Sequence, residues 1–279
     1  MELSLQDASS DLGHKFAMLR RSVRVLAVAL VGGLAVASAQ GTFGHIAYGG
    51  GWQTTFVLVN ENTTTAANVS LHFYSDSGAN LPLSVNGDSA VSPYSGSIDP
   101  GGSVSLVVSD PGSPAANEGW ASLQVTNSVA VSGQAIFRQN LGSPHPILEA
   151  TVPLTGGPPV CIFSFWNVEP THYILVPFDN TTNLHLTAFA FANTTSASIS
   201  APIEFDDQTG AVIVSDKLKL GAMNHSAFVS TTNYPATVGK TGVLRITLPS
   251  GASAGDLVVL GLLANPTTGT LTTVLPITQ

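Results

Sequence analysis

The stretch FVLVNENTTTAANVSLHFYSDSG, residues 56–78, recurs later in the chain as FAFANTTSASISAPIEFDDQTG, residues 189–210. Each copy holds two short runs in which apolar and polar residues alternate, separated by Asn, Thr and Ser. Alternation with a period of two is typical of β-strands that bury one face. The match pairs Phe56 with Phe189 and Phe73 with Phe205. The sequence therefore predicts that one β-domain occurs twice in tandem.

The remainder of the chain repeats in the same order. EGWASLQV (118–125) matches TGVLRITL (241–248), and ILEATVPL (147–154) matches TLTTVLPI (270–277). A period of about 125–130 residues indicates a duplicated domain, because solenoid repeats are far shorter. The Gly- and Pro-rich segment LTGGPPV (154–160) lies between the copies as the expected linker.

Each copy has the size and the strand spacing of an immunoglobulin-like sandwich, without its Cys–Trp–Cys hallmark. We therefore expect an all-β protein with two tandem immunoglobulin-like β-sandwich domains, 40–155 and 156–279, after a signal peptide at 1–39. Strands are expected at Thr54–Val59, Val69–Tyr74, Val104–Val108, Ala121–Val125, Gly133–Phe137, Leu186–Phe191, Ile203–Phe205, Val212–Val214, Val243–Leu248 and Leu257–Leu263.

Comparison of the copies predicts which residues face the core. Ala121 and its alternate neighbours correspond to Leu244 and its neighbours, and all are apolar, so this phase should point inward. The intervening positions hold Trp120 in one copy and Val243 in the other, which places Trp120 on the outer face. Trp52 is in phase with the inward residues, so we expect it to close one end of the core.

The N-terminus is typical of a secretory signal peptide. Basic residues at 15–24 precede an apolar run, Val25–Val36, and Ala37-Ser38-Ala39 forms an A-x-A cleavage site. A membrane-spanning helix needs about 20 apolar residues, so a stable transmembrane anchor is not expected. The sequence predicts cleavage after Ala39 and a secreted, periplasmic or cell-surface bacterial protein.

Composition excludes several kinds of partner. The formal net charge is −8, and only 9% of the residues are charged. Nucleic acids and anionic membrane surfaces both require basic patches, so neither is expected as a partner. Cys161 is the only cysteine and alternates with apolar residues, which predicts a buried thiol rather than a nucleophile.

Three motifs resemble catalytic sites but lack an essential part. Gly49–Gly51 is followed by Trp and Gln instead of the Lys-Ser of a phosphate-binding loop. Ser253 lies in a G-x-S-x-G motif, yet it joins two expected strands and no histidine follows it. Asp76 begins an Asp-Ser-Gly sequence that the second copy replaces with Asp207-Gln-Thr-Gly, so no aspartate pair forms. We expect turns at all three, no catalytic residue, and a protein that is not an enzyme.

Metal-ligating patterns are also weak. The histidines of the mature chain show no H-x-H or H-x-x-x-H spacing, and Glu204, Asp206 and Asp207 do not form a calcium-loop sequence. The sequence therefore predicts no metal site and no cofactor.

Aromatic residues remain as candidates for binding. Exposed rings can stack on the apolar face of a sugar. Trp120, Tyr74 and Trp166 are the residues we expect to contact a ligand, either a glycan or another surface protein.

The pattern G-G-G-W-x-T-x-[FIV]-x-L-x-N, followed by F-x-[DS]-x-x-G and then G-W-A, resembles repeats of secreted bacterial proteins to which no activity is attached. Here it is carried by Gly49–Asn60, Phe73–Gly78 and Gly119–Ala121. The resemblance implies export and a β-sandwich fold. The favoured interpretation is a non-catalytic exported protein with a surface, adhesion or structural role; the alternatives are a carbohydrate-binding protein and a periplasmic pilus chaperone.

Overall fold

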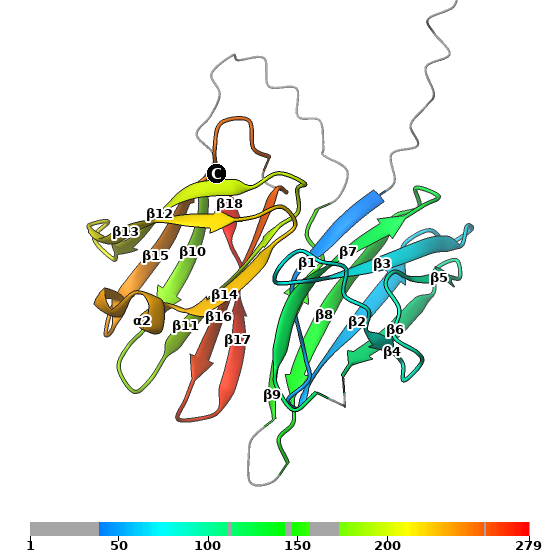
Figure 1. Cartoon of the computed structure of the whole chain (residues 1–279), viewed down its shortest axis with the longest axis horizontal. Coiled ribbons are helices and arrows are strands. Elements are labelled where there is room, and N and C mark those ends of the chain that lie inside the picture. The colour runs from blue at the N-terminus through cyan, green and yellow to red at the C-terminus, as the bar shows by residue number, and fades with distance from the viewer. Residues whose placement is uncertain (1–38, 111–112, 143–146, 157–172, 254, 279) are drawn as a thin grey trace, which may run out of the picture. The chain divides into compact units, whose positions relative to one another are not determined.

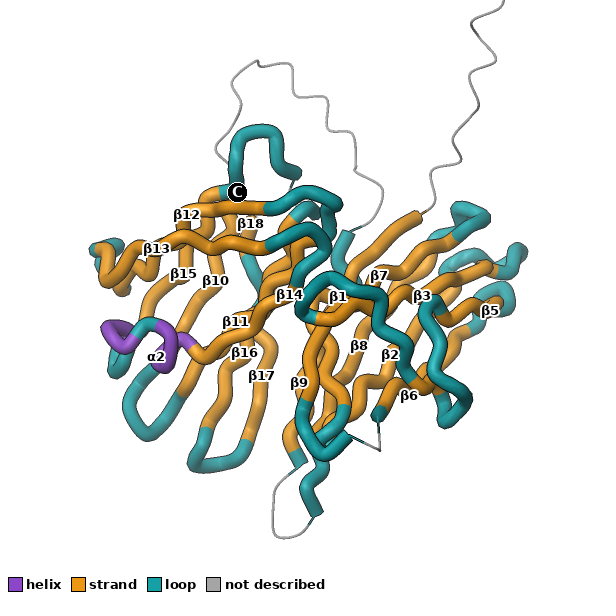
Figure 2. Tube along the Cα trace, viewed as in Figure 1, coloured by secondary structure: helices purple, strands orange, loops and turns teal. Residues whose placement is uncertain are grey.

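The structure is a computed structural model that describes residues 39–110, 113–142, 147–156, 173–253 and 255–278. These residues form an all-β fold, as the sequence predicts (Figure 1). The helical turns among them, purple in Figure 2, are the short α2 (Ser230–Asn233) and η1 (Pro235–Thr237) after β14. None of the described helices is long and apolar enough to cross a membrane. Residues 1–38 of the expected signal peptide, Cys161 and Trp166 lie outside the described residues.

The first half of the described chain, blue to green in Figure 1, folds into two antiparallel sheets with the strand orders β1-β7-β3-β5 and β4-β6-β2-β8-β9. Its strands are β1 (Ala39–Tyr48), β2 (Trp52–Asn60), β3 (Ala67–Ser75), β4 (Ser84–Val85), β5 (Tyr94–Ile98), β6 (Ser103–Ser109), β7 (Asn117–Val125), β8 (Val131–Gln139) and β9 (Leu148–Pro153).

The second half, yellow-green to red, folds in the same way, with the orders β13-β12-β15-β10-β18 and β14-β11-β16-β17. Its strands are β10 (Tyr173–Asp179), β11 (Leu186–Asn193), β12 (Ile199–Asp207), β13 (Val212–Leu220), β14 (His225–Val229), β15 (Thr241–Thr247), β16 (Leu257–Asn265), β17 (Thr270–Val274) and β18 (Ile277–Thr278).

The two halves correspond strand by strand. β1, β7, β3 and β5 occupy the places of β10, β15, β12 and β13, and β6, β2, β8 and β9 occupy those of β14, β11, β16 and β17. Every strand expected from the sequence overlaps one of these strands, but three are longer than expected, since β7 begins at Asn117, β12 begins at Ile199 and β13 continues to Leu220. The sequence does not predict β4 and β18, which hold two residues each, nor the strands whose residues alternate less clearly, which are β1, β5, β9, β10, β14 and β17.

The expected inward-facing residues form the two cores. Phe56 and Phe73 are fully buried in the first half, and Phe189 and Phe205 are buried in the second. Rings pack edge to face, as between Phe189 and Phe205 at 5.9 Å. The predicted inward phase of β7 and β15 is also confirmed, since its residues are buried; they are Ala121, Leu123, Val125, Leu244, Ile246 and Leu248.

Two polar residues of the repeated pattern are buried at equivalent places. The Thr54 hydroxyl donates to the Ala47 carbonyl and accepts from the Ala47 amide. The Thr187 hydroxyl makes the same pair of hydrogen bonds with Asp179. Each threonine thus links its own strand to the preceding strand of the chain, which belongs to the other sheet of the same half. Both hydroxyls have a donor and an acceptor within the protein and need no water.

A glycine also recurs for a visible reason. A Cβ atom on Gly119 would lie 2.2 Å from the Tyr74 carbonyl oxygen, and one on Gly242 would lie 1.9 Å from the Asp206 carbonyl oxygen. Backbone approaches this close require the absence of a side chain. The glycine of the G-W-A pattern therefore serves strand pairing in both halves.

One sheet is covered on both faces. β11 and β16 turn Phe189, Phe191 and Val259 toward the core of the second half, while Ala190 and Leu260 on the opposite face pack into the core of the first. β1 lies against both of these strands. The halves are therefore joined through an apolar contact that this sheet provides.

Candidate functional site

Trp120 lies at the contact between the halves, and its expected role as an exposed platform is wrong. Its side chain is only 1% exposed and packs with Ala192, Val258 and Met223 of the second half. The indole Nε1 donates to the Met223 carbonyl at 2.8 Å. Trp120 does point away from the core of the first half, as its position on the strand predicts. The second half covers that outer face, however, so the ring does not meet solvent.

Tyr74 accompanies Trp120 from the neighbouring strand. The two residues are directly paired between β3 and β7, and their rings stack with centroids 4.4 Å apart. Tyr74 is half-buried, and burial raises the pKa of its hydroxyl. Of the three aromatic residues expected to contact a ligand, Tyr74 and Trp120 come together, whereas Trp166 lies outside the described residues.

A bulge in β1 places a histidine beside this contact. The register moves from Phe43 opposite Ala121 to Ile46 opposite Gly119, so β1 holds one extra residue there. Bulges redirect side chains and are frequent next to functional sites. Gly44, within the bulge, allows close approach of β16, since a Cβ atom there would lie 2.6 Å from Val258.

His45, the bulge residue, begins a chain of polar contacts between the halves. Its ring is 4% exposed, and its Nδ1 lies 3.2 Å from Nε2 of His225 on β14. The Nδ1 of His225 lies 2.7 Å from Oδ1 of Asp76, in the turn after β3. An ionised carboxylate only accepts hydrogen bonds, so Nδ1 of His225 carries the proton and its Nε2 lone pair faces His45.

Glu118 adds a second carboxylate from β7. One ligand atom from each of His45, Glu118 and His225 lies within 4.8 Å of the others. Glu118 is exposed, whereas both imidazoles are buried. These three residues and Asp76, which together we call the histidine cluster, thus come from β1, β7, β14 and the turn after β3.

Electrostatics keep one ring of the cluster neutral. Burial, and then the neighbouring His225, lower the pKa of His45 to about 3. The pKa of the Glu118 carboxyl is raised, mainly because protein atoms displace water from it, with Asp76 adding to the effect and His225 opposing it. A neutral imidazole retains a lone pair, which is what a metal ion or a proton donor would use.

The motifs rejected as catalytic form turns, as expected. The Gly49–Gly51 segment has positive φ at every residue, and the Trp52 amide closes the turn on the Gly49 carbonyl at 2.8 Å. Trp52 packs against Phe137 at the end of the core. The Ser253 amide donates to the Asp256 carboxylate in a loop between two strands, so no nucleophile elbow forms there.

The acidic group considered for calcium is already paired. Arg245 Nη2 lies 2.6 Å from Glu204, and its Nε lies 3.0 Å from Asp206. Asp207 accepts hydrogen bonds from Thr209 and from the Ala211 amide within its own turn. These carboxylates are engaged within the protein and do not converge on a common point.

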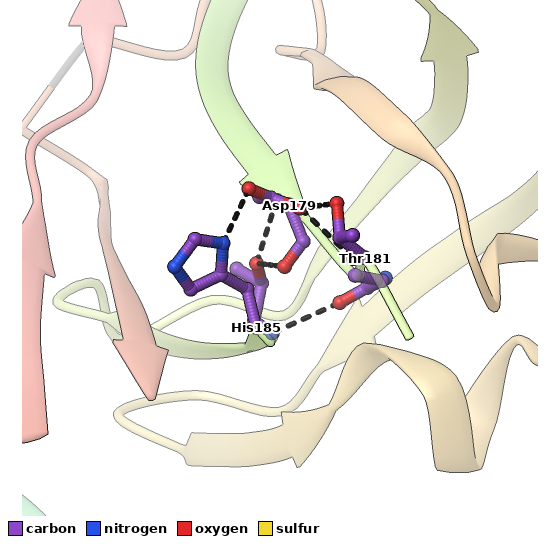
Figure 3. A network of polar contacts seen from close by, with 5 residues as sticks. Asp179, Thr181 and His185 are labelled. Carbon is purple, nitrogen blue, oxygen red and sulfur yellow. Dashed lines mark hydrogen bonds and ion pairs between the residues drawn. The ribbon is translucent and has the colours of Figure 1, made fainter. Parts of the chain in front are cut away.

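A second histidine–carboxylate pair lies in the second half (Figure 3). His185 Nδ1 is 2.7 Å from Asp179 Oδ2, and Thr181 donates to Asp179 Oδ1 through both its amide and its hydroxyl. Burial would raise the pKa of Asp179, but the hydrogen bonds from Thr181 and His185 lower it below its usual value. Among the described residues, no third histidine or carboxylate joins this pair in a ligand cluster.

A groove opens beside the aromatic contact. Its volume is about 880 Å³, and it is lined by Tyr74, Trp120 and Gln124 on one side and by Thr194 and Val258 on the other. The described lining holds no Lys or Arg, and Asp256 is its one charged residue.

Comparison of the chain with protein-family models, with curated proteins and with solved structures finds no match.

The histidine cluster was missed because its members are far apart in the sequence and obey no ligand spacing. The sequence does contain a signal for the contact between the halves, since β16 reads LVVLGLLAN and has no alternating polar residues. A continuous apolar run indicates a strand buried on both faces. That pattern predicts a covered sheet, although it does not identify the covering residues.

Proposed function

We propose that this chain is a non-catalytic exported protein in which 40–155 and 156–279 are two immunoglobulin-like sandwiches with a surface, adhesion or structural role. The likeness is architectural, since most consecutive strands here enter opposite sheets, and only the pairs β8–β9, β12–β13 and β16–β17 stay in one sheet. The observation that carries the proposal is the buried contact around Trp120.

A buried apolar contact between domains restricts their relative motion. Trp120 is held by stacking on Tyr74 and by its hydrogen bond to Met223, so the halves are fastened at a defined point. Such a unit suits a structural or adhesive module better than a protein that closes over its substrate. Uncharged polar residues on the exposed strand positions also suit a protein outside the cell; examples are Ser103, Ser105, Ser132, Thr270 and Thr272.

The test is surface exposure in the source organism. Protease added to intact cells is expected to degrade the protein while a cytoplasmic marker survives, and deletion of its gene is expected to reduce attachment or envelope integrity. Recovery of the protein in the cytoplasmic fraction would overturn the proposal. So would turnover of ester, glycoside or peptide substrates by the purified chain.

The second candidate is carbohydrate binding, which the groove favours. Amide and hydroxyl side chains beside an aromatic edge are suited to sugar hydroxyls, and Tyr74, Gln124 and Thr194 are so arranged along it. Binding on a glycan array that is lost in Gln124→Ala would support this function, and a flat array would exclude it. Trp120→Ala would not test sugar binding, because that ring is buried.

A pilus chaperone is not favoured. Such chaperones hold a partner's carboxylate with basic residues in the cleft between domains. The described lining of the groove has no such residue, and Arg138 lies on β8, paired in register with Glu149 of β9.

A further inference from the structure

We propose that His45, His225 and Glu118 bind one divalent transition-metal ion of the zinc class, with Asp76 orienting His225. The proposal goes beyond the surface role and does not depend on it. It rests on the geometry of the histidine cluster, which brings four side chains together from both halves of the chain.

The spacing of the two imidazoles fits a shared ion. Zn–N bonds of 2.0–2.1 Å in a tetrahedral site place two ligand nitrogens about 3.3 Å apart. The Nδ1 of His45 and the Nε2 of His225 are separated by 3.2 Å. An ion at this position lies off the line between the nitrogens and accepts one lone pair from each ring, which requires the proton of neutral His45 to move from Nδ1 to Nε2. The bond between the rings is replaced by two bonds to the ion.

The partner of His225 has the arrangement typical of metal sites. Metal-ligating histidines usually donate their other ring N–H to a carboxylate, which fixes the tautomer and the ring plane. Asp76 accepts this hydrogen bond at 2.7 Å, and its carbonyl also accepts from the His225 amide at 3.1 Å. His225 is therefore held at two points, with Nε2 turned toward His45.

Glu118 supplies the third ligand. Two histidines and one glutamate form a known zinc ligand set, with water completing the tetrahedron. The Glu118 oxygen lies within 4.8 Å of both imidazole nitrogens, and rotation of its exposed side chain brings it to ligand distance. Because imidazole and carboxylate together suit zinc, copper and nickel more than calcium, a first-row transition metal is the expected occupant.

The site has a structural consequence. His45 and Glu118 belong to the first half and His225 to the second, so a bound ion would link the halves beside Trp120. An ion that binds only the folded chain stabilises it in proportion to the logarithm of its concentration. Zn²⁺ is therefore expected to raise the melting temperature of the purified chain, and EDTA is expected to reverse the increase.

The test is titration of the purified full chain with Zn²⁺ by isothermal calorimetry. We expect one ion per chain. Glu118→Gln is expected to weaken binding at least tenfold, and Asp76→Asn by about 10–100-fold. Both residues are exposed, so their replacement should leave the fold intact, which circular dichroism verifies. Glu61→Gln, the same change at an exposed site away from the cluster, is the matched control and should bind as the wild type does.

A spectroscopic readout separates coordination from general stabilisation. Co²⁺ in a tetrahedral protein site gives strong visible absorption, expected in the wild type and in Glu61→Gln and absent in His225→Gln. Absence of saturable one-to-one Zn²⁺ binding would overturn the proposal and leave His45 and His225 as a hydrogen-bonded pair. Wild-type affinity in both Glu118→Gln and Asp76→Asn would overturn it as well.

Discussion

The two halves use the same place in their fold in opposite ways. On the outer face of the first half, Tyr74 on β3 stacks on Trp120 of β7, and the second half buries Trp120 while Tyr74 stays half-buried beside it. At the equivalent place in the second half, Asp206 on β12 faces Val243 of β15, and Arg245 joins Asp206 to Glu204. Inward positions keep the same apolar character in both halves, because each must fill a core. Outward positions are free of that constraint. In the first half this outer face packs against the second half, whereas in the second half the same face carries ion pairs.

Trp120→Ala tests the contact and has the largest expected effect. Removal of a fully buried tryptophan side chain costs about 3–5 kcal/mol of unfolding free energy. The variant also leaves the Met223 carbonyl without its donor. Urea denaturation followed by tryptophan fluorescence measures the loss. Val243→Ala at the partly buried equivalent position is the control, with an expected cost of about 1 kcal/mol or less. Equal stability of the two variants would contradict the comparison.

Acidification tests the histidine cluster. His45 is neutral in the folded chain, because burial and His225 lower its pKa to about 3 from 6.5. Below pH 6.5 the unfolded chain gains a proton at this ring that the folded chain does not. Stability is therefore complete above pH 6.5 and falls as the pH drops toward 3, by at most about 1.4 kcal/mol per pH unit. Glu118, whose pKa is raised, acts in the opposite direction and reduces the net slope.

The measurement is the urea midpoint in EDTA between pH 6.5 and 4.5. His45→Gln is expected to flatten the decline over this range. Asp179→Asn in the second half should not, because the pKa of Asp179 is lowered below 3.8 and its stabilisation is lost only as the pH falls through that lower value. Identical slopes for His45→Gln and the wild type would show that this ring does not govern the acid response.

The sequence alone predicts the strands and the inward faces because both depend on local alternation. Phe56, Phe189, Leu123 and Ile246 all lie where the repeated pattern places them. The site could not be predicted in this way. His45 and His225 are 180 residues apart, and the bulge that turns His45 toward its partner has no distinct sequence signature.

Trp120 illustrates the same limit. Its phase on β7 predicts correctly that it points away from the first core. Whether that face meets solvent depends on a sheet from the other half, which a pattern within one strand does not encode. The continuous apolar run of β16 shows that a covering exists, and only the fold shows that Trp120 lies beneath it.

The buried threonines provide a test of likeness between the halves. Thr54→Val and Thr187→Val each remove a hydroxyl that accepts from one amide and donates to one carbonyl. Leaving these backbone groups unpaired costs about 1–3 kcal/mol, and the two losses should be similar. Thr55→Val, on the opposite face of β2, is the control and should change stability by less than about 0.5 kcal/mol. A clear inequality between the two buried variants would show that the halves do not share this element of construction.

Arg245→Ser has the smallest expected effect and tests the charged face. It places at this position the residue that the first half carries as Ser122. Arg245 is one-third exposed, and ion pairs at such sites contribute about 0.2–1 kcal/mol. Asp206 is only 13% exposed, however, and loses its cation, so we expect a cost toward the upper end of that range. Measured at low and at high salt, the difference from the wild type should shrink as salt screens the pairs. A cost that salt does not change would mean that Arg245 stabilises the chain by packing. The two outer faces would then differ in how their side chains pack and not in their electrostatics.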